Sequence, residues 1–341
     1  MIKYLKRFVF DRLGHMVKEI FSRIIEAIEE KVIDKEIDLD KNNFIEIKKE
    51  QFGNKIAFID GGQAELLKAV NFSLQFIRTT ALIFKDNRKV DSSLNEFFVL
   101  AYADNNEYKT EIFQLKGDAI DNMSIDSLDS SIREGNERAS VSKIGNIVRR
   151  FAELKLAKQM IEKLEKEDIV VLDGSLKCMV KGEDNYMQEL FQKAEESGII
   201  VASLAKTSKI LAENGSCIAS QLSKLADSKN EWYYYLNDEG NLSISMVKLN
   251  KSSNHVFEFN IFNKQKELAE SVLGLLANNS NDAVFPGYPY GLMQADKFAR
   301  VSNQERDYLL TSFKANAGKR WNKLKQSVNV LNAHEILDTI S

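Results

Sequence analysis

Two short apolar segments of this chain end in the same way, each with an aspartate followed by a glycine. The first spans residues 56–62 (IAFIDGG) and the second spans residues 169–175 (IVVLDGS). A continuous apolar run of this length is typical of a strand buried on both faces of a sheet. If the two strands are parallel neighbours, Asp60 and Asp173 meet at one edge of the sheet, where open α/β sheets bind ligands. Two carboxylates that close together repel each other unless a cation holds them, although an Asp-Gly pair by itself also fits a simple turn.

Composition narrows the kinds of site that the chain can build. With 341 residues, 44% of them hydrophobic, we expect one large domain with appendages. The net charge of −3 gives no overall basic character, so any contact with nucleic acid must be a local patch. The cysteines and histidines are few and scattered, which excludes a disulfide framework and disfavours a zinc site or a Ser-His-Asp triad. A catalytic metal would therefore have oxygen ligands, as magnesium and manganese prefer.

The N-terminal residues predict a long amphipathic helix. Apolar residues recur at spacings of three and four from Ile2 to Ile28, which indicates a helix over about residues 2–32. Such a helix can pack on its own domain, on a second copy or on a partner protein, and the sequence leaves these alternatives open. No stretch has the length of a transmembrane span, and charges interrupt the N-terminal apolar residues, so we expect a cytoplasmic protein without a membrane partner.

The order of predicted elements favours an α/β fold. We expect a polar linker over 34–52, a strand ending at Asp60, strands over 66–85, 97–102 and 108–115, and an acidic loop over 117–131. A helix over 138–166 then precedes the second aspartate-bearing strand. It is followed by helix 184–197, strand 199–203, helix 207–227, strands 232–236, 242–249 and 256–262, and further helices after Lys264. This order predicts a mixed β-sheet flanked by helices, with a right-handed crossover between the two aspartate strands, as in an RNase H-like sheet.

Two aspartates rarely complete the ligand shell of a divalent cation, so a third acid is expected nearby. From Glu153 the predicted helix climbs about 20 Å to Lys166. The strand then returns about 15 Å to Asp173. The two paths nearly cancel, so Glu153 comes back to the level of Asp173, and we select it over the other helical glutamates.

Three further features are candidates for phosphate binding or for shaping a site. Lys206 follows the predicted strand 199–203, where an ammonium group can neutralise a phosphate oxygen. Arg149 and Arg150 lie within one turn of Glu153 and could contact backbone phosphates. The loop over residues 287–291 (GYPYG) is rigid and aromatic. Each also has a simpler explanation, as solvated side chains or as an ordinary connecting loop.

Taken together, these motifs resemble the NurA nucleases. The resemblance is carried by the segments IDGG (59–62), RRxxE (149–153), VLDGSL (171–176), AKTS (205–208) and GYPYGLMQAD (287–296), in that order, within about residues 55–310. It implies an RNase H-like fold and a manganese- or magnesium-dependent DNA nuclease. It also implies a homodimer that works with a HerA-type hexameric ATPase in DNA end resection, repair or anti-phage defence. The expected parts are an N-terminal helix (1–34), a nuclease domain (53–316) and a C-terminal extension (317–341).

The resemblance also assigns site residues. It implies that the metal ligands are Asp60, Glu153 and Asp173, in agreement with the choice made from spacing. The full set of predicted catalytic residues is Asp60, Glu153, Asp173, Lys206, Tyr288 and Asp296, and the predicted DNA-binding residues are Arg149, Arg150 and Lys206.

One position departs from the family. Asp296 follows Ala295 where the family usually has a histidine. A carboxylate there can add a metal ligand but cannot replace the proton chemistry of histidine at neutral pH. The alternative function is therefore a catalytically impaired adaptor that keeps the nuclease fold in order to bind the ATPase. A sugar-kinase-like phosphotransferase is disfavoured because the chain lacks a P-loop lysine motif.

Overall fold

The fold comes from a computed structural model of the chain. It describes residues 18, 20, 22–23, 39–49, 53–118, 120–208, 210–211, 217–226, 230–322 and 324–325. The predicted N-terminal helix over 2–32 lies outside the described residues apart from four positions, and so do residues 326–341 of the predicted C-terminal extension. Both therefore stay predictions.

The described residues form a single mixed sheet of 11 strands, in the order β1-β9-β10-β11-β8-β7-β2-β3-β4-β5-β6. The pairs β2–β7 and β7–β8 are parallel, and all the other neighbouring strands are antiparallel. The strands are β1 (Phe44–Glu46), β2 (Ile56–Lys68), β3 (Phe72–Lys85), β4 (Arg88–Asp104), β5 (Glu107–Lys116), β6 (Ser124–Asp126), β7 (Ile169–Asp173), β8 (Ile200–Ala205), β9 (Trp232–Glu239), β10 (Leu242–Lys248) and β11 (Phe257–Phe262).

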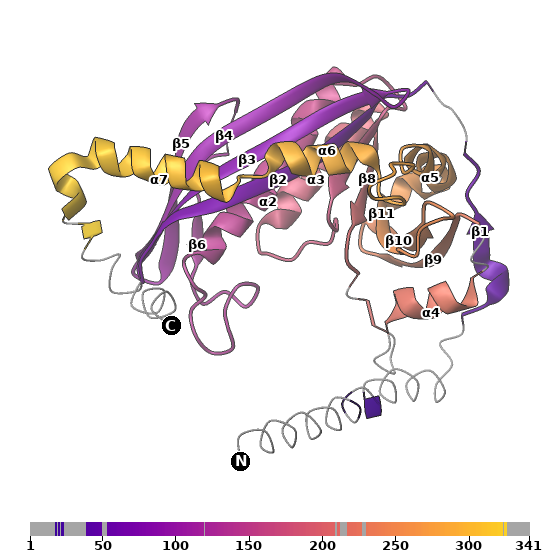
Figure 1. Cartoon of the computed structure of the whole chain (residues 1–341), viewed down its shortest axis with the longest axis horizontal. Helices are drawn as coiled ribbons and strands as arrows, with labels where there is room; N and C mark the ends of the chain where they lie inside the picture. The colour runs from indigo at the N-terminus through magenta and orange to yellow at the C-terminus, as the bar shows by residue number, and fades with distance from the viewer. Residues whose placement is uncertain are drawn as a thin grey trace, which may run out of the picture.

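Helices cover both faces of the central strands (Figure 1). Alternate residues of β2 and β7 face opposite ways, and each set packs in its own core. Phe58 and Val171 pack with α5 and α6, whereas Ile59 and Leu172 pack with α2 and α3. The described helices are α2 (Lys143–Met160), α3 (Glu183–Ser197), α4 (Ile218–Leu225), α5 (Ala269–Asn278), α6 (Tyr290–Ala299) and α7 (Asn303–Ala317), with short 3₁₀ turns at Lys41–Asn43, Ile161–Lys163, Asn263–Leu268 and Gly318–Arg320.

The predicted architecture is confirmed: the fold is mixed α/β, with a sheet flanked by helices. The two aspartate-bearing strands are parallel neighbours, and their register pairs Ile59 with Leu172. The long α2 and the 3₁₀ turn after it make the crossover between them. None of the described helices has both the length and the apolar character needed to cross a membrane.

The prediction that the first strand ends at Asp60 is wrong. Strand β2 continues through Gly61 and Gly62 to Lys68, because the antiparallel strand β3 pairs with it over this whole length. Only the parallel pairing with β7 stops at Ile59. The Asp-Gly-Gly sequence therefore marks the place where β2 leaves its parallel neighbour, not a turn.

Several other boundaries also differ from the prediction. The expected polar linker over 34–52 contains β1, whose residue Phe44 packs edge-on against Trp232 at 4.9 Å between ring centroids. The predicted strand over 66–85 is divided between the end of β2 and β3. The helix predicted over 138–166 starts only at Lys143. Of the helix predicted over 207–227, the described residues are helical only over Ile218–Leu225.

Candidate metal centre

Asp60 and Asp173 lie side by side where β2 and β7 stop pairing. Each follows directly after the last paired residue, Ile59 in one strand and Leu172 in the other. Both belong to the alternating set that faces α5 and α6. Asp60 is only 8% exposed, and its Oδ1 accepts a 2.7 Å hydrogen bond from the backbone N–H of Gly61.

Helix α6 brings a third carboxylate to the same place. A Cβ atom at Gly291 would overlap the ring of Phe58, so glycine at this position lets α6 lie close against β2. This packing directs Asp296 toward the strand ends. Among the residues that the structure describes, Asp60, Asp173 and Asp296 form a cluster in which one carboxylate oxygen of each lies within 4.8 Å of the others.

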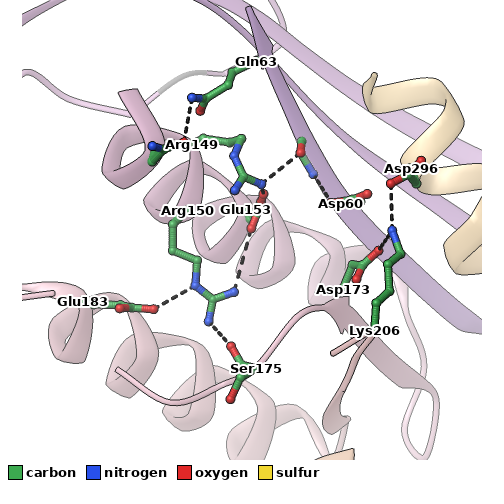
Figure 2. Close-up of polar contacts among 12 residues, drawn as sticks. Asp60, Gln63, Arg149, Arg150, Glu153, Asp173, Ser175, Glu183, Lys206 and Asp296 are labelled. Atoms are coloured by element: carbon green, nitrogen blue, oxygen red, sulfur yellow. Dashed lines mark hydrogen bonds and ion pairs between the residues drawn. The ribbon is translucent and has the colours of Figure 1, made fainter. Parts of the chain in front are cut away.

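Lys206 provides the positive charge beside this cluster. It follows β8, which is parallel to β7 and therefore ends at the same edge. Its Nζ lies 2.8 Å from Asp173 Oδ2 and 2.8 Å from Asp296 Oδ1, so the ammonium bridges the two carboxylates (Figure 2). The same Nζ lies 5.5 Å from the ring centroid of Tyr288, which is buried in the loop before α6.

Burial and neighbouring charges shift the pKa values of the groups in this site. Burial, together with the charges of Asp173 and Glu153, raises the pKa of Asp60 to about 8. Burial also raises the pKa of Asp173, despite the opposing effect of Lys206. For Lys206, burial alone would lower the pKa, but the neighbouring Asp173 and Asp296 raise it. The pKa of Tyr288 is raised well above its usual value by burial and by Asp173.

Glu153 approaches the same strand from the opposite face. It lies on α2, and its carboxylate packs against Gly61, where any Cβ atom would overlap Glu153 Oε1. Glu153 is 4% exposed, and burial raises its pKa although Arg149 and Arg150 act in the other direction. The predicted return of Glu153 to the level of Asp173 agrees with this placement, since Gly61 comes directly after Asp60, where β2 stops pairing with the strand that carries Asp173.

Arg149 and Arg150 hold Glu153 in place (Figure 2). Arg149 Nη1 contacts Glu153 Oε1 and donates to the carbonyl oxygen of Gly61 at 2.9 Å. Arg150 Nη1 lies 3.8 Å from Glu153 Oε2. The other nitrogens of Arg150 donate to Glu183 Oε1 at 2.8 Å and to the carbonyl oxygen of Ser175 at 2.7 Å. These contacts within the protein favour a positioning role for Arg150, and its predicted contact with DNA stays a prediction.

The structure thus gathers the predicted acids around one strand, on its two faces. Asp60, Asp173 and Asp296 form the close cluster, and Lys206 and the ring of Tyr288 lie beside it. Glu153 lies on the other face of β2, against Gly61. The sequence did not point to Glu183, the buried partner of Arg150, since an acidic residue at a helix start is common. The sequence also did not point to Glu258 and Asn260, the buried polar residues within the predicted strand 256–262.

The cluster fits a hard divalent cation. Oxygen ligands on opposite sides of Mg²⁺ lie about 4.2 Å apart, so oxygens within 4.8 Å are close to the spacing that one ion requires. Burial and the charges of Asp173 and Glu153 raise the pKa of Asp60 to about 8, so the opposing charge of Lys206 does not fully compensate this carboxylate. All three side chains of the cluster offer only oxygen, which suits magnesium or manganese better than softer metals.

Comparison with solved structures gives nuclease folds. The NurA nuclease from Sulfolobus solfataricus matches with a TM-score of 0.57 and 14% identity, covering 92% of this chain and 98% of that one. The catalytic domain of human Endonuclease V matches with a TM-score of 0.41 and 12% identity, covering 80% and 92%. Ciona intestinalis Endonuclease V, in complex with an inosine-containing DNA, gives 0.39 and 13%, covering 83% and 96%.

Comparison of the sequence itself gives a family. No curated protein sequence matches the chain. The NurA domain, in contrast, matches residues 54–301, a segment that includes every residue of the cluster. Since this match covers well over half of the sequence, the chain belongs to the NurA family.

Proposed function

We propose that this chain is a divalent-metal-dependent DNA nuclease that hydrolyses phosphodiester bonds with Mn²⁺ or Mg²⁺. The observation that carries the proposal is the cluster of Asp60, Asp173 and Asp296, with oxygens within 4.8 Å of one another beside a lysine. Membership of the NurA family and the shared fold with a NurA nuclease support this reaction class.

Asp60, Asp173 and Asp296 would hold the ion. Glu153, which was predicted as a metal ligand, would contribute its carboxylate from the other face of β2. When bound, the ion supplies positive charge to the scissile phosphate and lowers the pKa of a water molecule. Lys206 has a side chain that is 43% exposed, and it would neutralise a phosphate oxygen at the rim of the site. The ring of Tyr288, buried 5.5 Å from Lys206 Nζ, would form the floor of the site, and Arg149 would keep Glu153 oriented. Gly61 and Gly62, without side chains, would leave room for a close approach of the DNA backbone.

The test is degradation of end-labelled DNA with Mn²⁺, Mg²⁺ or EDTA. We expect cleavage with the metal and none with EDTA. Asp60→Asn should lower the rate at least about 100-fold while leaving the fold intact. Asp307→Asn is the matched control, because this aspartate lies on α7 with a side chain that is 68% exposed. Cleavage by Asp60→Asn at the wild-type rate would refute the assignment.

The partners follow from the family and not from the geometry. We propose that the chain acts as a homodimer with a HerA-type hexameric ATPase, in DNA end resection, repair or anti-phage defence. We also propose that it works in the cytoplasm. Light scattering on the purified chain should give twice the mass of one copy. Co-purification with the ATPase from the same genome tests the second partnership, and a chain that stays monomeric and unbound would contradict both.

One observation favours a second candidate, the catalytically impaired adaptor. The Lys206 ammonium occupies a position between Asp173 and Asp296, and Asp296 replaces the histidine expected from the family resemblance. A permanent internal cation would make a metal unnecessary. This candidate predicts no metal-dependent DNA cleavage by the chain, alone or with the ATPase, together with tight binding to the ATPase.

A further inference from the structure

Strand β11 carries two buried polar residues that the proposed reaction does not use. Glu258 is 5% exposed and Asn260 is fully buried, while Phe257, Phe259 and Ile261 alternate with them. Because they are two residues apart, both side chains project from the same face of the sheet. Burying a carboxylate and an amide is unfavourable unless hydrogen bonds satisfy them, so their partners indicate what they do.

Asn260 holds the turn that follows Asp173. Its Oδ1 accepts hydrogen bonds from Ser175 Oγ at 2.9 Å and from the backbone N–H of Leu176 at 3.0 Å. The turn begins at Gly174, whose φ of +96° is a conformation that glycine adopts readily. Since Gly174 has no side chain to restrain it, the contacts of Asn260 fix the backbone immediately after Asp173.

Glu258 connects Asn260 to the turn that follows Lys206. Its Oε1 accepts from Asn260 Nδ2 at 3.1 Å, and its Oε2 accepts from Ser208 Oγ at 3.1 Å. Ser208 lies two residues after Lys206, and its own Oγ accepts from the backbone N–H of Ile210 at 3.2 Å. The pair on β11 therefore contacts both turns that carry the charges of the Asp173–Lys206 ion pair.

The same turn is also held from α2. Arg150 donates to the carbonyl oxygen of Ser175 at 2.7 Å and lies 3.8 Å from Glu153 (Figure 2). Ser175 is thus held through its carbonyl oxygen by α2 and through its hydroxyl by β11. A continuous set of polar contacts joins the elements that carry Glu153, Asp173 and Lys206.

We propose that Asn260, supported by Glu258, is a positioning residue for the metal site. It acts through Ser175, Leu176 and Ser208, which set the backbone that carries Asp173 and Lys206. This inference rests on the proposed function, since it assumes that the aspartate cluster binds a divalent ion. Residues that orient metal ligands from behind typically change metal affinity or activity by about 10- to 100-fold when they are altered.

The test uses a reciprocal pair of substitutions. Asn260→Asp keeps the acceptor oxygen for Ser175 and Leu176 but places a second carboxylate against Glu258, so the two repel each other. In the double variant with Glu258→Gln, the new amide can donate to the new carboxylate and restore the contact in the opposite direction. Because the exchange would also relieve a folding defect that arises from this repulsion, Mn²⁺ binding is compared only between variants whose circular dichroism and melting temperature match those of the wild type.

Mn²⁺ binding is measured from the electron paramagnetic resonance signal of the free ion, which does not require activity. For Asn260→Asp we expect affinity for Mn²⁺ to fall roughly tenfold, and kcat on single-stranded DNA to fall with little change in KM. The double variant should recover most of both. Asn95→Asp is the control, since Asn95 is also a buried asparagine that accepts from a backbone N–H, that of Asp118 at 3.0 Å, but lies on β4.

Ser175→Ala is the second variant if Asn260→Asp does not fold. It removes the hydroxyl that donates to Asn260 Oδ1, which also contacts Glu258 Oε1 at 3.5 Å and accepts from the backbone N–H of Lys177 at 3.2 Å. It should weaken Mn²⁺ binding in the same direction. Wild-type Mn²⁺ affinity in both Asn260→Asp and Ser175→Ala, or no recovery in the double variant, would overturn the inference while leaving the proposed nuclease intact. Wild-type protein that binds no Mn²⁺ would instead overturn the proposed metal site itself.

Discussion

At the scale of single residues, Asp60 links the candidate site to the stability of the protein. An aspartate in the unfolded chain loses its proton near pH 4, whereas burial and the neighbouring Asp173 and Glu153 raise the pKa of folded Asp60 to about 8. Between these values the folded protein binds one proton more than the unfolded chain. The free energy of unfolding in EDTA should therefore fall as the pH rises from about 4 to 8 and then level off.

Asp60→Asn removes this titration. The variant should melt several degrees higher than the wild type at pH 8 in EDTA, and the difference should shrink toward pH 5. Thermal melts followed by circular dichroism across this pH range provide the measurement, with Asp307→Asn as the exposed control. If melting temperature depended on pH in the same way in the wild type and in Asp60→Asn, then Asp60 would not be the group whose raised pKa lowers stability at high pH.

Asp296 gives a second prediction at this scale, because it is the position that departs from the family. As a third oxygen ligand, it should contribute to ion affinity, and Asp296→Asn should weaken Mn²⁺ binding by roughly tenfold or more. Lys206 would keep Asp173 as its partner in that variant, so the fold should be retained. Titration with Mn²⁺ measures the change. Unaltered affinity would mean that Asp296 serves only as a partner for Lys206.

At the scale of elements, the contact between α2 and β2 depends on a residue without a side chain. A Cβ atom at Gly61 would overlap Glu153 Oε1 and come within 3.1 Å of Arg149 Cγ. Gly61→Ala should push the Glu153 carboxylate away from β2, lowering stability by about 1–3 kcal/mol and reducing cleavage. The control is Gly53→Ala, since a Cβ there would meet no atom within 4 Å.

Denaturant unfolding and the DNA cleavage assay check both parts of this prediction. Gly53→Ala should stay within about 0.5 kcal/mol of the wild type. If Gly61→Ala matched Gly53→Ala in both assays, then the close packing of Glu153 on β2 would have no role in the site.

The sequence was sufficient to predict those strands and acidic residues that depend on a local pattern, such as an apolar run or the length of a helix. The apolar runs ending at Asp60 and Asp173 gave the parallel pair, and helix and strand lengths selected Glu153. The continuation of β2 beyond Asp60 was not predictable, because Gly61 and Gly62 resemble a turn until β3 pairs with them. The tertiary partner outweighed local propensity here.

The supporting residues were harder to find than the ligands. Glu258 and Asn260 interrupt an apolar strand at alternate positions, a pattern that normally indicates one solvent-facing side. In the fold both residues are buried, and their hydrogen-bond partners lie in two turns from distant parts of the chain, at Leu176 and at Ser208. No periodicity within one segment contains that information, since it depends on which turns β11 meets.

At the scale of the whole molecule, the residues around the aspartate cluster come from both faces of the sheet. Helices α5 and α6 cover one side of the sheet and α2 and α3 cover the other (Figure 1). Asp296 lies on α6, whereas Glu153 and its two arginines lie on α2. Strand β2 lies between them and carries Asp60 toward one face and the bare backbone of Gly61 toward the other. Acidic groups therefore converge from both layers of the fold, and the part of their repulsion that Lys206 and the two arginines do not offset opposes folding until a metal ion binds.

This arrangement predicts that divalent ions stabilise the entire fold. An ion that binds the folded cluster but not the unfolded chain adds about 2.7 kcal/mol at a concentration 100 times its dissociation constant, which corresponds to roughly 4 °C in melting temperature for a chain of this size. Mn²⁺ should raise the melting temperature of the wild type by about this amount, and EDTA should reverse the change. Asp60→Asn should lose most of the shift, whereas Asp307→Asn should keep it. A shift of equal size in both variants would place the ion elsewhere on the protein, because only the first substitution removes a ligand from the cluster.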